Sequence, residues 1–160
     1  MKLENQTLIN LGVRNNLNNR IYEDNDNLRE CIKDFNDRVD KYGKVYGQLG
    51  HPDRFDTHFL KVSHTIKNVR VEEDKVVGDI EILKTPSGEI LQEMIDDGLD
   101  YAITSRAAGS TNEDGTVTIK KIFSFDFVTN NVPFEVKWKS KESKRIFNDL
   151  DPYGEENWEE

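Results

Sequence analysis

Two short segments of this chain carry side chains that together could cleave a covalent bond. In the first, Gly50 and Pro52 favour a turn that would leave the imidazole of His51 exposed. In the second, two hydroxyls and a guanidinium (Thr104, Ser105 and Arg106) follow an apolar run and precede a predicted small-residue loop at 107–109. A hydroxyl beside a histidine can act as a nucleophile, and backbone N–H groups in such a loop can stabilise an oxyanion.

The remaining histidines and the cysteine are weaker candidates. His64 alternates with apolar neighbours, so we expect it to be packed or hydrogen-bonded within a strand, and His58 has no distinctive surroundings. Cys31 lies on an apolar helical stripe, which is typical of a small core residue. A single cysteine and three histidines predict no disulfide, no zinc site of Cys/His type and no other metal or cofactor.

Length and charge exclude several classes of protein. A chain of 160 residues corresponds to one domain. Its net charge is −9, of which the five acids in the last ten residues supply −5, leaving −4 on the rest. Because the charges are dispersed and form no basic stripe, we expect no nucleic-acid partner. No apolar run is long enough for a membrane span or resembles a signal peptide, which favours a cytoplasmic protein without a membrane partner.

Hydrophobic periodicity places the elements that must position these side chains. Apolar residues spaced from Leu28 to Tyr42 predict a helix that Asp24 or Asp26 caps and Gly43 ends. Alternation over 69–83 predicts a β-hairpin, and Thr85-Pro86 begins a second, shorter helix that stops at Gly98. Further strands are expected near 8–13, 99–105 and 116–128, and the last should place Phe123, Phe125 and Phe127 on one face.

These elements predict an α+β fold, with a small mixed, mainly antiparallel sheet or partial β-barrel surrounded by two or three helices. We expect residues 1–134 to form the domain. Residues 135–160 should form a C-terminal extension with a weak helix over 141–150 and an acidic, solvated tail.

A series of motifs in fixed order resembles the prohead core proteases of tailed myophages, and it covers residues 19–134. The motifs are Asn19-Arg20-Ile21-Tyr22, Gly47-Gln48-Leu49-Gly50-His51-Pro52, Val62-Ser63-His64-Thr65-Ile66, Val77-Gly78-Asp79-Ile80, Thr85-Pro86-Ser87-Gly88, Thr104-Ser105-Arg106-Ala107-Ala108-Gly109-Ser110 and Phe125-Asp126-Phe127-Val128. Each motif alone is weak, but seven in the family's order and at similar spacing are specific.

The resemblance implies a serine endopeptidase with a fold similar to herpesvirus assemblin. Such an enzyme acts in the host cytoplasm inside the assembling prohead, is found in the virion, and cleaves phage scaffold or core proteins, the major capsid protein and commonly itself. A homo-oligomer is also expected. By the same resemblance His51 is the general base, Asp126 orients and balances its imidazolium, and Arg106 stabilises negative charge or pairs with Asp126.

One departure from the family leaves the nucleophile open. The first hydroxyl of the family's Ser-Ser-Arg-Gly segment is its nucleophile, and here that position is Thr104. A strand directs neighbouring side chains to opposite faces, so Ser105 replaces it only if the register differs or the chain bends. Three outcomes follow: Ser105 is the nucleophile, Thr104 is a slower β-branched nucleophile, or the site is inactive.

Two non-enzymatic functions therefore stay open beside the protease. In one, the chain is a catalytically inactive homologue that acts as a structural or scaffold-associated head protein. In the other, it is a plain binding domain whose motifs are coincidental.

Overall fold

A computed structural model describes residues 1–15, 19–50 and 55–129 of the chain. In this part, six strands and two α-helices follow one another with a short 3₁₀ turn, η1. Their bounds are β1 Lys2–Asn10, α1 Asp26–Tyr42, β2 Val45–Gln48, η1 Phe59–Lys61, β3 Val62–Glu72, β4 Lys75–Ile82, α2 Pro86–Asp96, β5 Tyr101–Thr111 and β6 Val117–Thr129.

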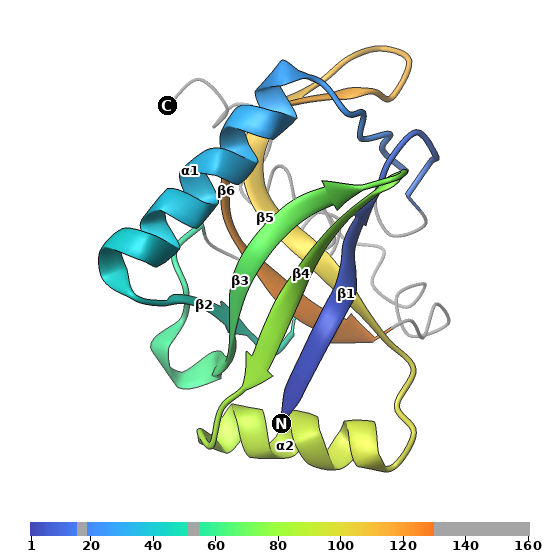
Figure 1. The fold of residues 1–160 in the computed structure, drawn as a ribbon. Helices are drawn as coiled ribbons and strands as arrows, with labels where there is room; N and C mark the ends of the chain where they lie inside the picture. Colours follow the sequence, from blue (N-terminus) through green and yellow to red (C-terminus); the bar gives the residue numbers. More distant parts are fainter. Residues whose placement is uncertain (16–18, 51–54, 130–160) are drawn as a thin grey trace.

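The strands form two antiparallel sheets that face each other (Figure 1). The larger sheet has the order β1-β4-β3-β2, and β5 and β6 form a long hairpin of their own. At one junction Leu49, just after β2, bridges Phe127 of β6. At the other, the Tyr101 hydroxyl of β5 donates to Gln6 Oε1 of β1 at 2.9 Å. The result is an open, barrel-like α+β fold, which confirms the predicted fold class.

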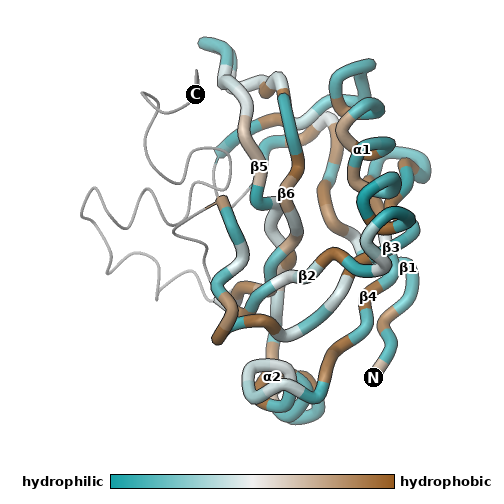
Figure 2. The backbone as a smooth tube through the Cα atoms, turned by 90° about the vertical axis from the view of Figure 1, so that its left-hand side faces the viewer, coloured by the Kyte–Doolittle hydropathy of each residue, from teal (hydrophilic) through white to brown (hydrophobic). Residues whose placement is uncertain are grey.

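Helix α1 covers the space between the two sheets with one apolar stripe. Leu28, Cys31, Ile32 and Phe35 are buried, while the rest of the helix is mainly hydrophilic (Figure 2). Gly43 ends the helix as predicted, with a φ of 85° that glycine adopts at little cost. The N-cap is Asn25, whose side chain accepts from the Leu28 N–H, and not Asp24 or Asp26.

The predicted β-hairpin and second helix are also present. Strands β3 and β4 pair across a two-residue turn, and β3 begins at Val62, earlier than the alternation indicated. Thr85 caps α2 by accepting the Gly88 N–H at 3.0 Å. This helix ends at Asp96, two residues before Gly98.

Two local predictions were wrong because strand pairing overrides local composition. Residues 107–109 form no loop: they continue β5, where Ala107 lies opposite Ile122 and Gly109 opposite Ile119. A Cβ at Gly109 would lie 2.2 Å from the Thr118 carbonyl oxygen, so closeness to the partner strand requires a small residue there. Strand β1 covers 2–10 instead of 8–13, because its pairing with β4 begins at Lys2.

A β-bulge in β6 changes the expected arrangement of the phenylalanines. Arg106 pairs with Ser124 and Ala107 with Ile122, so Phe123 is an extra residue with no partner in the ladder. Phe125 and Phe127 lie in the core, whereas Phe123 stacks on Phe55 at 4.9 Å between ring centroids. The prediction that all three share one face was therefore wrong for Phe123.

The predicted C-terminal extension at 135–160, with its helix over 141–150, lies outside the described residues. Within the residues described, no helix has the length and apolar character needed to cross a membrane.

Phe35 provides a direct test of how α1 is held. Its side chain is fully buried and meets the Phe125 ring edge-on at 5.5 Å. Phe35→Ala should lower the free energy of unfolding by about 3–5 kcal/mol, because it removes aromatic packing and leaves a cavity. Tyr42→Ala, on the same helix but 69% exposed, is the matched control and should change it by less than about 0.5 kcal/mol. Urea denaturation measures both, and equal losses would contradict the described packing.

Candidate active site

A fully buried ion pair joins β5 and β6 at the predicted site. The Arg106 guanidinium donates to both carboxylate oxygens of Asp126, from Nε at 3.0 Å and from Nη2 at 2.8 Å, and neither side chain is exposed. Arg106 Nη1 also donates to the Phe55 carbonyl at 3.1 Å and to Thr57 Oγ1 at 2.9 Å. A bidentate pair with these extra bonds fixes both strands and the 55–57 loop in one geometry.

The segment that precedes His51 is attached to β6 next to this ion pair. The Gln48 N–H donates to Asp126 Oδ1 at 3.0 Å, and the Gly50 N–H donates to the Phe127 carbonyl at 2.8 Å. Gly50 has a φ of 98°, a conformation that residues with a side chain rarely adopt. The Gly-x-Leu-Gly part of the motif therefore fixes the position from which the chain continues to His51.

Gly47 allows this segment to approach β3 and β6 closely. A Cβ at this position would lie 2.1 Å from His64 Nε2 and 2.3 Å from the Phe125 carbonyl oxygen. Because that carbonyl only accepts, His64 Nε2 carries the hydrogen and donates to it at 2.8 Å. His64 Nδ1 in turn accepts from the Ser63 hydroxyl at 2.8 Å. His64 is thus a buried strand histidine, as its alternating surroundings predicted.

The pKa of His64 is lowered to about 4, mainly because burial disfavours the charged ring. The nearby positive charge of Arg106 lowers it further, and the bond to the Phe125 carbonyl partly opposes both effects. His64 is therefore neutral at pH 7 and joins β3 to β6 as a hydrogen-bonding group.

Thr104 and Ser105 lie on opposite faces of the β5–β6 hairpin. Thr104 pairs with Asp126, so its side chain shares a face with Asp126 and Arg106. Ser105 pairs with Phe125 and shares the face directed to the core. Both hydroxyl-bearing residues are buried, at 6% and 2% exposure.

His51 lies outside the described residues, but the chain on either side of it is described. Gly50 is bound to Phe127, and Phe55 and Thr57 are bound to Arg106. Both flanks of residues 51–54 are thus attached to the hairpin that carries Thr104, Asp126 and Arg106.

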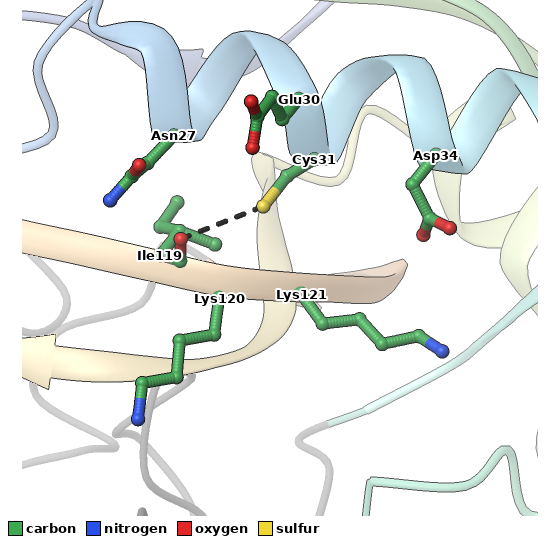
Figure 3. A pocket seen from close by; sticks show the side chains of 7 residues that line it. All are labelled: Asn27, Glu30, Cys31, Asp34, Ile119, Lys120 and Lys121. Atoms are coloured by element: carbon green, nitrogen blue, oxygen red, sulfur yellow. Dashed lines mark hydrogen bonds between the residues drawn. The ribbon is translucent and has the colours of Figure 1, made fainter.

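A polar groove between α1 and β6 contains the thiol of Cys31 (Figure 3). Glu30 and Asp34 line its helical wall, and Lys120 and Lys121 lie on the strand. Cys31 Sγ lies 3.6 Å from the Ile119 carbonyl oxygen, and burial, helped by Asp34 and Glu30, raises the pKa of the thiol to about 11. A thiol that stays protonated at neutral pH is a poor nucleophile, in agreement with its predicted role in the core.

Sequence reasoning found the charged and hydroxyl residues but missed the groups that hold them. Thr57 and the Gln48 backbone N–H gave no signal of their own, because their partners lie 49 and 78 residues away along the chain. Across the described parts of the chain, no cluster of three or more His, Cys, Asp or Glu residues could hold a metal ion.

His64 predicts a distinct dependence of stability on pH. Its pKa is about 4 in the folded protein against about 6.5 when unfolded, so only the unfolded chain gains this proton between those pH values. The contribution of neutral His64 to the free energy of unfolding is fully present above pH 6.5. This free energy should fall by about 3 kcal/mol as the pH drops to 4, in addition to any effect of carboxyl groups.

The contribution of His64 is isolated by comparing the wild type with His64→Gln in denaturant titrations from pH 7 to 4. The variant should lose less stability over this range, and His58→Gln, at an exposed histidine, is the matched control. Parallel curves for wild type and His64→Gln would contradict the described environment.

Two comparisons with known proteins give matches, one to a protein family and one to a solved structure. A family model described as prohead core protein serine protease matches residues 8–142. Among solved structures, the fold is similar to the bacteriophage T4 capsid assembly protease, gp21, with a TM-score of 0.59 and 16% sequence identity. The similarity covers 81% of this chain and 87% of that one. A search of curated proteins finds no match to the sequence.

Proposed function

The chain belongs to the prohead core protein serine protease family, and we propose that it is an endopeptidase that acts inside the assembling phage prohead. Its proposed substrates are the scaffold or core proteins and the major capsid protein of its own phage. The observation that carries this proposal is the attachment of Gly50 to β6 beside Asp126, on the hairpin that presents Thr104.

His51 is the proposed general base. His51 directly follows Gly50, whose N–H donates to the Phe127 carbonyl. Because successive Cα atoms are about 3.8 Å apart, this bond restricts where His51 can start. The loop that follows returns to Arg106 through Phe55 and Thr57. This double attachment supports placing the imidazole over the face of the hairpin that carries Thr104.

Thr104 is the proposed nucleophile, in preference to Ser105. Thr104 shares a face with Asp126 and Arg106, and Arg106 binds the Phe55 carbonyl in the loop after His51. Ser105 lies on the opposite face, which packs into the core. In this scheme the Thr104 hydroxyl attacks the scissile carbonyl carbon and its proton passes to His51. His51 then protonates the departing amine, and water releases the acyl group by the reverse steps.

Asp126 is proposed to support the base chiefly through the backbone. Its carboxylate binds Arg106 twice and accepts the Gln48 N–H, which lies three residues before His51. Arg106 balances the charge of Asp126, and it also donates to the Phe55 carbonyl in the loop that follows residues 51–54. We therefore assign Asp126 and Arg106 as positioning residues for His51.

A second candidate function is a catalytically inactive head protein that keeps the protease fold. The observation that favours it is the threonine at the family's nucleophile position, because its additional methyl group restricts rotation and access of the hydroxyl. The two functions differ in whether the wild-type chain produces fragments.

The experiment incubates the purified chain with the prohead core and capsid proteins of its phage and identifies fragments by mass spectrometry. His51→Ala and Thr104→Ala should each lower the cleavage rate by about 10³-fold or more, because each removes a member of the reacting set. Thr104→Ser should remain active. His58→Ala, which changes an exposed histidine, is the matched control and should cleave as the wild type.

Each other outcome has a defined meaning. Loss of activity in Ser105→Ala with activity kept in Thr104→Ala would assign the nucleophile to Ser105. Intact substrates with both the wild type and His51→Ala would overturn the protease and favour the inactive head protein.

A further inference from the structure

A polar slot separates the edges of β1 and β5 upstream of Thr104. Residues 5–7 and 99–103 line it, and its volume is about 510 Å³. Strand β1 pairs with β4 on its other side, and β5 pairs with β6 on its other side. The two strands belong to separate sheets, and no backbone ladder joins their described residues across the slot. The Tyr101 hydroxyl and Gln6 Oε1 bridge it through their side chains, and an added strand would displace this hydrogen bond.

The backbone of β5 is directed so that Ile103 presents its polar groups to this slot. In β6, the carbonyls of Phe125 and Phe127 point away from β5, because they accept from His64 Nε2 and from the Gly50 N–H. Groups on an antiparallel strand alternate in direction, so those of Asp126 point toward its partner, Thr104. On β5 the neighbouring residue, Ile103, therefore directs its N–H and C=O to the opposite edge.

We propose that this slot holds the extended substrate segment that is to be cleaved, paired as an added strand with the edge of β5 at Ile103. The inference rests on the proposed protease function and adds where and how the substrate binds. Strand addition at an exposed sheet edge is a general mode of peptide recognition, in which backbone hydrogen bonds supply much of the affinity.

Two features favour an extended peptide as the occupant. The lining includes Asn5, Gln6, Thr7 and Asp100, so the slot is polar and suits a peptide backbone better than an apolar ligand. The wall formed by β5 also continues directly into Thr104, so a strand paired at Ile103 brings its neighbouring peptide bonds to the proposed nucleophile.

A slot-filling variant tests the site in the active protein. Thr7 is exposed on β1 and lines the slot, so Thr7→Trp should lower kcat/KM for peptide cleavage at least tenfold, mainly by raising KM. Asn10→Trp is the matched control, because Asn10 is exposed on the same strand but does not line the slot, and it should behave as the wild type. Equal kinetics for the two variants would overturn the proposal. A Thr7→Trp variant that cleaves as the wild type but has a changed oligomeric mass would overturn it too, because the slot would then contact a second copy of the chain.

A second measurement does not depend on how Thr7→Trp folds. Cleaved peptides are resynthesised with a single N-methyl group at each position in turn and offered to the wild-type protein. Pairing along an edge predicts that cleavage is lost at alternate positions, because every second N–H of a strand faces its partner. Uniform tolerance, or loss without this alternation, would overturn strand addition.

A binding experiment separates failure of the slot from failure of the protease. Overlapping peptides that cover the phage's prohead core proteins are added to the Thr104→Ala variant, and amide hydrogen exchange is followed by NMR. Slower exchange at Ile103 supports the slot even if the wild type cleaves nothing. Cleavage by the wild type while peptides bind without protecting Ile103 would overturn the slot and leave the protease intact.

Discussion

The arrangement of the site depends on the buried ion pair between Arg106 and Asp126. Both side chains are withdrawn from water, and each is compensated by the other and by further hydrogen bonds. Removing one partner of such a pair costs about 3–5 kcal/mol, because the remaining charge is left buried. The pair thus constrains four segments together: β5, β6, the end of β2 and the loop at 55–57. No apolar contact of similar size would specify their positions as narrowly, because dispersion forces have no direction.

Much of the fold could be predicted from local pattern. The apolar stripe of α1, the hairpin of β3 and β4, and the Thr85-Pro86 start of α2 each depend on residues close together in the sequence. The small residues at 107–109 were misassigned because their reason lies on the partner strand, where the Thr118 carbonyl leaves no room for a side chain at Gly109. Phe123 was misplaced because a single unpaired residue reverses the alternation, and nothing in the composition of β6 indicates where that residue falls.

The site shows the same division between local and distant causes. Residue types singled out His51, Thr104, Ser105 and Arg106, and resemblance to a family added Asp126, but the sequence left open which of the two hydroxyls is the nucleophile. Cross-strand register separates them, since Thr104 faces the charged pair and Ser105 faces the core. The part played by Gly47 was likewise hidden, because a glycine is needed there to leave room for the His64 ring and the Phe125 carbonyl, which come from two other strands.

The bulge at Phe123 has a consequence for how this part of the chain can change in length. Because Phe123 is the extra residue, the strand without it would still pair Ala107 with Ile122 and Arg106 with Ser124, and Asp126 would keep its face. The Phe123 ring instead stacks on the ring of Phe55, and the Phe55 carbonyl accepts a hydrogen bond from Arg106. Deletion at this one position would thus spare the charged pair and loosen the segment after the histidine motif.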